Sequence, residues 1–153
     1  MKKYTSKKKK IITICSSAAF FKQALEVEKQ LAAMGYAVKL PYTAMKMKKS
    51  GDYRVETYKT WFDDPKQYAR KTWLIKNHLR KVKSGDAVLV LNYEKKGVPG
   101  YIGGNTLIEA AIGFDHGKPI YILNPISPDL GFKEEIYGLQ PIFLNGDISN
   151  IRL

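Results

Sequence analysis

The chain has 153 residues, of which 44% are hydrophobic, and it carries a formal net charge of +12 at pH 7. This length and composition predict one globular domain with a substantial core, and no apolar run is long enough for a membrane span. The apolar run after Lys10 is too short for a signal peptide, and the single cysteine, Cys15, excludes an internal disulfide. We therefore expect a cytoplasmic protein in which Cys15 is a buried, inert thiol.

The positive charge allows two interpretations. The Lys and Arg residues, 26 in all, are spread along the chain, with one cluster at residues 7–10 and another at residues 46–49. The charge either gives weak, non-specific affinity for nucleic acid or reflects a surface that is lysine-rich throughout. We favour the second interpretation because no nucleic-acid-binding motif accompanies the charge. Residues 1–9 are predicted to be a solvated basic tail that precedes a domain over residues 10–153.

Strands and helices alternate along the first forty residues. Residues 10–15 are predicted to form a strand because the isoleucines and the threonine there are β-branched. Apolar residues then recur with a helical period from Ser17, a candidate N-cap, to Met34, and Gly35 ends that helix. A second strand over residues 36–40 completes a right-handed βαβ unit.

Residues 42–63 are the least regular stretch of the chain. They are longer than an ordinary connection, so they form either a lid or binding loop, or an irregular surface excursion with small helices of its own. Beyond them the pattern predicts a helix over 64–83, a strand over 87–91, a loop over 93–102, a helix over about 105–116, a strand over 120–123, a helix over 132–139 and an edge strand over 141–144.

Five strands with intervening helices, and no internal repeat or interdomain linker, indicate a single α/β domain. The expected architecture is a flavodoxin-like, doubly wound, five-stranded parallel sheet with the strand order 2-1-3-4-5. In such a sheet the carboxyl ends of the first, third and fourth strands share one rim, where open α/β folds bind ligands.

The stretch over residues 103–114 is the strongest candidate for a functional element. Gly103 and Gly104 allow a sharp turn after the buried strand, and Asn105 or Thr106 can cap the helix that follows. Glu109 comes near the first turn of that helix. A glycine turn at a helix N-terminus binds anions, and a carboxylate beside it can act as a base or as a nucleophile towards an anomeric carbon.

The shared rim predicts a site for a small planar molecule that carries a sugar. Aromatic side chains stack on a base, while hydroxyl groups and turn amides hold ribose or phosphate. The predicted substrate-binding residues are Ser16, Ser17, Phe20, Phe21, Asn92, Gly103, Gly104, Asn105 and Thr106. No cofactor is predicted, and no metal site either, because no group of His, Cys and Asp residues has ligand spacing.

Structural roles are the alternative for each charged candidate. Glu109 can simply complement the helix dipole, and His78 can be a half-buried helix residue. His116 beside a helix C-terminus and Asp86 on the opposite rim of the sheet are both interpreted as structural.

Three segments resemble the nucleoside 2-deoxyribosyltransferase-like proteins, which include deoxynucleoside 5'-monophosphate N-glycosidases. Residues 15–21, Cys-Ser-Ser-Ala-Ala-Phe-Phe, are similar to the family's first strand and small-residue loop. Residues 105–113 resemble its Gly-Thr-x-x-Glu helix, and residues 117–121 resemble the exit from that helix. The resemblance covers about residues 11–148 and implies that Glu109 is the nucleophile and that the protein is a homodimer or larger.

The chain departs from the family pattern at two positions. Gly103 replaces an acid six residues before the nucleophile, and His78 aligns with a family aspartate. A histidine there can move a proton to or from the base, with a pKa near 6.5. Two functions follow: cleavage or transfer of an N-glycosidic bond in a nucleoside or its 5'-monophosphate, with Glu109 and His78 as catalytic residues, or non-catalytic binding of a nucleotide or nucleic acid on the same fold.

Overall fold

The computed structural model describes residues 6–153. The predicted basic tail therefore lies partly outside the described residues, at 1–5. Residues 6–10 are exposed and have no regular secondary structure before the first strand. Within the described chain, no helix combines the length and the apolar character that crossing a bilayer requires.

A five-stranded parallel sheet forms the centre of the molecule, with the strand order β2-β1-β3-β4-β5. Its strands are β1 (Ile11–Ser16), β2 (Ala37–Lys39), β3 (Ala87–Leu91), β4 (Ile120–Ile122) and β5 (Ile142–Phe143). This arrangement confirms the predicted flavodoxin-like, doubly wound sheet. The register pairs Ser16 with Leu91, so β1 and β3 end side by side at one rim.

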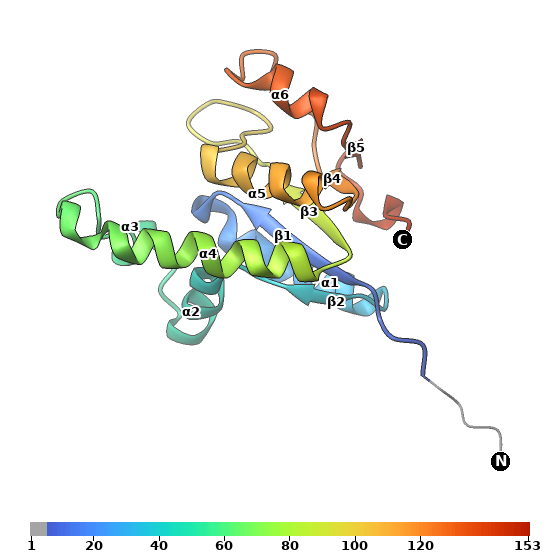
Figure 1. Cartoon of the computed structure of the whole chain (residues 1–153), viewed down its shortest axis with the longest axis horizontal. Coiled ribbons are helices and arrows are strands. Elements are labelled where there is room, and N and C mark those ends of the chain that lie inside the picture. Colours follow the sequence, from blue (N-terminus) through green and yellow to red (C-terminus); the bar gives the residue numbers. More distant parts are fainter. Residues whose placement is uncertain (1–5) are drawn as a thin grey trace.

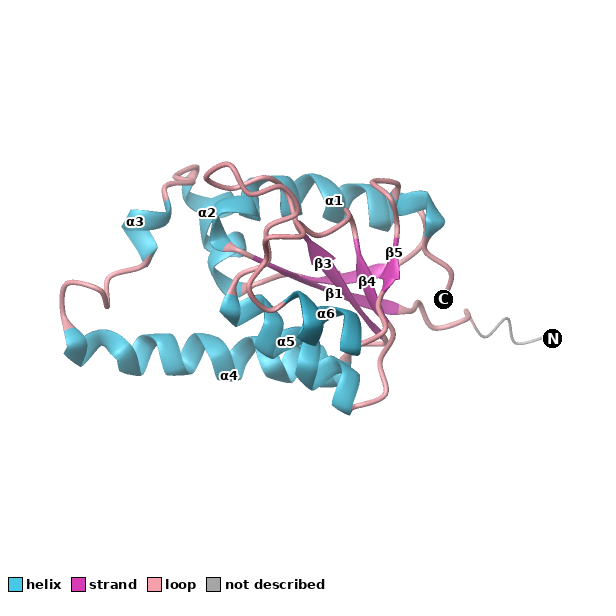
Figure 2. Cartoon of the chain, turned by 90° about the horizontal axis from the view of Figure 1, so that it is seen from above, coloured by secondary structure: helices cyan, strands magenta, loops and turns pink. Residues whose placement is uncertain are grey.

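Helices cover both faces of the sheet (Figures 1 and 2). They are α1 (Phe21–Ala33), α2 (Tyr42–Ser50), α3 (Val55–Tyr58), α4 (Tyr68–Ser84), α5 (Gly104–Asp115) and α6 (Lys133–Gly138), with 3-10 turns at Ala18–Phe20, Pro65–Gln67 and Ile148–Asn150. Helix α1 packs on one face, and α4, α5 and α6 lie on the other (Figure 2).

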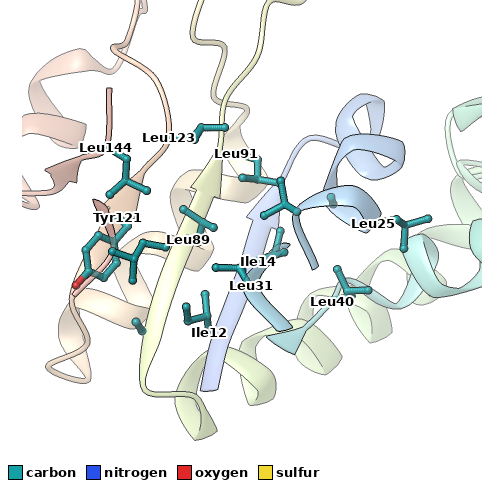
Figure 3. Close-up of a cluster of buried hydrophobic side chains, with 14 residues drawn as sticks. Ile12, Ile14, Leu25, Leu31, Leu40, Leu89, Leu91, Tyr121, Leu123 and Leu144 are labelled. Atoms are coloured by element: carbon teal, nitrogen blue, oxygen red, sulfur yellow. The ribbon is translucent and has the colours of Figure 1, made fainter. Parts of the chain in front are cut away.

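The alternation of side chains along β1 divides the core into two layers. Ile12 and Ile14 belong to the layer under α1, where they meet Leu89 and Leu31 (Figure 3). Cys15 points to the opposite face and joins the layer under α4, α5 and α6. Successive strand residues face opposite sides of a sheet, so Ile12 and Ile14 pack in one layer and Cys15 packs in the other.

Residues 42–63 contain two helices of their own, α2 and α3. Ala44, Met47 and Tyr58 from this segment form a separate small core with Phe21 of α1. Small helices, which one of the two interpretations of this stretch included, are therefore present. A local core fixes their position beside the end of β1.

The expected helix caps are wrong. Ser17 precedes a 3-10 turn and makes no capping hydrogen bond, and α1 starts only at Phe21. Helix α5 starts at Gly104 without a side-chain cap, because the Asn105 amide donates to Glu109 instead. The amide groups of the first turn of α5 therefore have no capping side chain.

Asp86 and His116 have the structural roles predicted for them. The Asp86 carboxylate accepts a hydrogen bond from the backbone amide of Ile11 at 2.7 Å, which ties the start of β1 to the start of β3. Nδ1 of His116 lies 3.0 Å from the carbonyl oxygen of Ile112 in the last turn of α5.

Close packing between α5 and the sheet yields a stability prediction. A Cβ atom on Gly113 would lie 2.7 Å from a methyl group of Val88 and 3.2 Å from Ile120. We expect Gly113→Ala to destabilise the protein by about 1–3 kcal/mol, because overpacking forces α5 off the sheet. Chemical denaturation measures this, with Gly104→Ala on the same helix as the control, since a Cβ there meets nothing within 4 Å. Equal stability of the two variants would contradict the packing argument.

Candidate active site

A cavity of about 200 Å³ opens at the carboxyl rim of the sheet. Its walls come from the loop after β1, the N-terminus of α5, one face of α4, and the segment that contains α2 and α3. Nine of the eleven predicted site residues line it: Ser16, Ser17, Phe21, His78, Gly103, Gly104, Asn105, Thr106 and Glu109. The structure therefore brings together residues that are nearly one hundred positions apart.

The other two predicted site residues, Phe20 and Asn92, lie outside the cavity lining. Phe20 is buried and packs edge-on against Tyr93, with ring centroids 5.4 Å apart. The Asn92 amide is fully buried, donates to the carbonyl oxygen of Asn124 at 2.7 Å, and accepts from the Asn124 amide at 2.8 Å. Asn92 thus joins the ends of β3 and β4, and its bonding capacity is used by the backbone rather than left for a ligand.

Glu109 is the central acid of the cavity. It lies in the second turn of α5, with only 5% of its surface exposed, and its Oε1 accepts a hydrogen bond of 2.8 Å from the Asn105 amide. Burial raises the pKa of Glu109 to about 8, against the opposing effects of the Cys15 thiol, the Lys71 ammonium group and Asn105. At neutral pH the free protein therefore holds this carboxyl group mostly protonated.

His78 lies deep in the cavity wall on α4. Its Nε2 is 2.9 Å from the carbonyl oxygen of Ile14, so Nε2 carries the proton and donates it to that oxygen. Burial, reinforced by the Lys81 charge, lowers the pKa of His78 to about 4. This contradicts the expected titration near 6.5, because desolvation of the imidazolium outweighs the hydrogen bond to the backbone.

Cys15, His78 and Glu109 contact one another beneath the cavity. Nε2 of His78 lies 3.5 Å from Sγ of Cys15 and 3.9 Å from Oε2 of Glu109. The directions of the two pKa shifts make both His78 and Glu109 neutral near pH 7, so their contact is not an ion pair. Burial also raises the pKa of the Cys15 thiol, which agrees with the inert role predicted for it.

The same three residues are the one group of potential metal ligands in residues 6–153, with ligand atoms within 4.8 Å of one another. The sequence spacing did not reveal this group, because it comes from three separate elements. Its geometry does not fit a metal ion. A metal ion bound to His78 Nε2 would need the lone pair of that nitrogen, so Nε2 could no longer donate a hydrogen bond to the Ile14 carbonyl oxygen. The ring proton would then be on Nδ1, which is buried without a hydrogen-bond partner.

One wall of the cavity, which is aromatic and cationic, was not predicted from the sequence. Its members are Tyr42, Tyr58, Trp61 and Tyr101 together with Lys59, Lys71 and Lys95. Most of them come from residues 42–63, whose irregular sequence gives no periodic signal. Lys71 was detectable, because it precedes Ile75 and His78 by four and seven residues on α4 and so shares their helix face.

Comparisons with known proteins agree with this fold. No family model and no curated protein matches the sequence. Among solved structures, a 2-deoxyribosyltransferase from the psychrotolerant bacterium Bacillus psychrosaccharolyticus is similar, with a TM-score of 0.51 and 19% sequence identity. The match covers 80% of this chain and 77% of that chain. The fold expected from the family resemblance is therefore confirmed: this chain has the same fold as a 2-deoxyribosyltransferase.

Proposed function

We propose that the protein cleaves or transfers the N-glycosidic bond of a nucleoside or deoxynucleoside, or of its 5'-monophosphate, with Glu109 as the nucleophile. The observation that carries this proposal is the buried Glu109 carboxyl group at the N-terminal end of α5. Within residues 6–153 it is the sole carboxyl group among the cavity-lining residues. The fold shared with a 2-deoxyribosyltransferase supports the same chemistry.

The reaction has two steps in this scheme. The Glu109 carboxylate attacks C1' of the sugar, the bond from C1' to the base nitrogen breaks, and its electron pair stays on the base, which takes up a proton. Water or a second base then attacks C1' and releases Glu109. Since the free carboxyl group is mostly protonated at neutral pH, it has to ionise first, and positive charge developing at C1' favours that ionised form.

Several polar groups of the cavity are available to a sugar. The Thr106 hydroxyl lines the cavity, is 1% exposed and has no partner within the described chain. The backbone amides of the first turn of α5 lie beside it without a side-chain cap. We assign the sugar to this end of the cavity and the base to the aromatic wall around Trp61.

His78 is a positioning residue in this scheme rather than a proton donor. Its Nε2–H group donates a hydrogen bond to the Ile14 carbonyl oxygen, and its low pKa keeps the ring neutral at physiological pH. The ring and the Cys15 thiol together form the floor on which the Glu109 carboxyl group rests.

The second candidate function is binding of a nucleotide without cleavage. Two observations favour it: Gly103 supplies no acid where the family has one, and Glu109 is protonated in the free protein. Incubation with a panel of nucleosides and 5'-monophosphates separates the two functions, because only the enzyme releases free base.

A homodimer or larger assembly stays a prediction, which sedimentation measures. Weak nucleic-acid binding also stays a prediction, which salt-dependent retention on DNA measures.

Replacement of the nucleophile gives the first activity prediction. We expect Glu109→Gln to reduce base release by several orders of magnitude, because the amide has almost the same shape but cannot form the glycosyl ester. Glu135→Gln, at an exposed position on α6, is the matched control and should keep full activity. Comparable rates for Glu109→Gln and the wild type would remove Glu109 from the mechanism.

The pH dependence distinguishes Glu109 from His78 as the group that controls the rate. We expect kcat/KM to rise with pH through about 8, because the carboxyl group must lose its proton before it attacks. His78→Asn, which can still donate to the Ile14 carbonyl oxygen, should leave the position of this rise unchanged. A rise centred near 6.5 that disappears in His78→Asn would instead restore the histidine as the proton-transfer group.

The buried carboxyl group also predicts a pH-dependent cost to stability. Its pKa is about 8 in the folded protein and about 4.5 when unfolded, so between these values the unfolded state releases a proton that the folded state keeps. Stability therefore falls as pH rises across this range, by a total on the order of a few kcal/mol. We expect Glu109→Gln to melt at a higher temperature than the wild type at pH 8 but not at pH 4. A mutant advantage that is the same at both pH values would show that Glu109 is not protonated in the folded state.

A further inference from the structure

Three lysine side chains from separate segments line the cavity that contains Glu109. Lys59 follows α3, Lys71 lies on the cavity face of α4, and Lys95 lies in the loop after β3. Lys59 feels the charges of both others, and Lys71 and Glu109 also feel each other's charge. The three lysines will be called the lysine trio.

The positive charge of the lysine trio has no compensating carboxylate. None of the ion pairs in the described chain involves a member of the trio. Glu109 is the one acid among the cavity-lining residues that the structure describes, and burial keeps it mostly protonated at pH 7. The free cavity therefore has an excess of positive charge that the fold does not neutralise.

Aromatic and hydroxyl groups hold two members of the trio in place. The Lys71 ammonium group lies over the Trp61 ring at 5.4 Å, and that of Lys95 lies over the Tyr101 ring at 4.9 Å. Lys95 also donates a hydrogen bond of 3.2 Å to the Ser17 hydroxyl. These contacts fix the ammonium groups at the cavity instead of leaving them free in solvent.

Holding these ammonium groups at the cavity destabilises the free protein. Burial, and for Lys59 also repulsion from Lys71 and Lys95, lowers the pKa values of Lys59 and Lys71. Half-buried cations that repel one another destabilise the fold unless an anion joins them. A ligand with negative charge relieves both effects when it binds.

We propose that the lysine trio is a subsite for a phosphate chain, and that the substrate is a nucleotide with more than one phosphate group. This inference rests on the proposed function and names its substrate class. A monophosphate carries roughly −1.5 to −2 at pH 7 and leaves the trio partly uncompensated. Each further phosphate adds about one more negative charge, so a 5'-diphosphate matches three ammonium groups.

The location of the subsite separates it from general attraction of anions to a basic protein. With the base assigned to the Trp61 ring and the sugar to the end of the cavity at Thr106 and Glu109, we assign the 5' substituent to the ammonium groups of the lysine trio, which line the same cavity. Lys76 lies on the same helix as Lys71 but is exposed and outside the cavity lining. It therefore serves as a matched control for charge alone.

Calorimetry on the full chain with inorganic pyrophosphate and inorganic phosphate tests the subsite without any turnover. We expect pyrophosphate to bind more tightly than phosphate at the same ionic strength. Lys59→Gln, Lys71→Gln and Lys95→Gln should each weaken pyrophosphate binding about tenfold or more, since each removes a charge-assisted contact. Lys76→Gln should leave the affinity unchanged, and melting curves establish that every variant is folded.

Gly103→Asp provides a test of opposite sign. The atoms nearest to a Cβ at Gly103 belong to the Tyr101 side chain, at 3.5 Å or more, so the Cβ itself makes no clash. The new carboxylate should weaken pyrophosphate binding by adding negative charge to the cavity. Equal affinity for phosphate and pyrophosphate, or an equal loss in Lys76→Gln, would overturn the proposal.

Base release from a nucleoside and its 5'-mono-, di- and triphosphates then separates the subsite from the glycosidic chemistry. We expect kcat/KM to be higher for the 5'-diphosphate than for the monophosphate or nucleoside, and the trio variants to remove that preference. Lysine-dependent pyrophosphate binding without base release from any compound would keep the subsite and overturn the proposed enzyme. Base release that depends neither on the number of phosphate groups nor on the trio would keep the proposed enzyme and overturn the subsite.

Discussion

Exclusion of water from the Glu109 carboxyl group is the condition on which the chemistry of this site depends. The group lies where β1, α4 and α5 meet, and each element contributes one contact: the Cys15 thiol, the His78 ring and the Asn105 amide. All of these contacts are polar, yet none supplies a full charge at neutral pH. Desolvation therefore dominates and holds the carboxyl group in its neutral form, which is unusual for a glutamate and typical of a functional one.

The architecture could be predicted from the sequence because the strands and most helices carry strong periodic signals. The β-branched run of β1 and the fully apolar run of β3 are typical of buried parallel strands. The apolar residues of α1 and of α4 recur with a helical period. The strand order in turn predicts the rim of the sheet at which Ser16, Thr106 and Glu109 lie together. The position of residues 42–63 could not be predicted, because their small core is completed by Phe21 of α1 and local sequence pattern does not show that contact.

The chemical state of the site residues was beyond sequence reasoning for a different reason. A pKa depends on burial and on the partners that tertiary structure supplies, so the same histidine can titrate near 6.5 at a surface or near 4 in this wall. Asn92 shows the same limit for hydrogen bonding, because its amide is used by the backbone of Asn124, a residue on another strand connection. Lysines posed the hardest case: with 26 basic residues in the chain, no pattern singles out the three that share a cavity.

Glu109 is coupled to the lysine trio through the charge of Lys71. Lys71 favours the ionised carboxylate, so an anion that neutralises Lys71 removes part of that help and raises the pKa of Glu109 further. In the proposed scheme, a bound phosphate chain alone therefore makes the Glu109 carboxyl group harder to ionise. What restores its charge is the positive character that develops at C1' as the base departs, which is strongest in the transition state. In the proposed scheme the carboxyl group ionises before it attacks, and the charge developing at C1' then stabilises the carboxylate most strongly in the transition state.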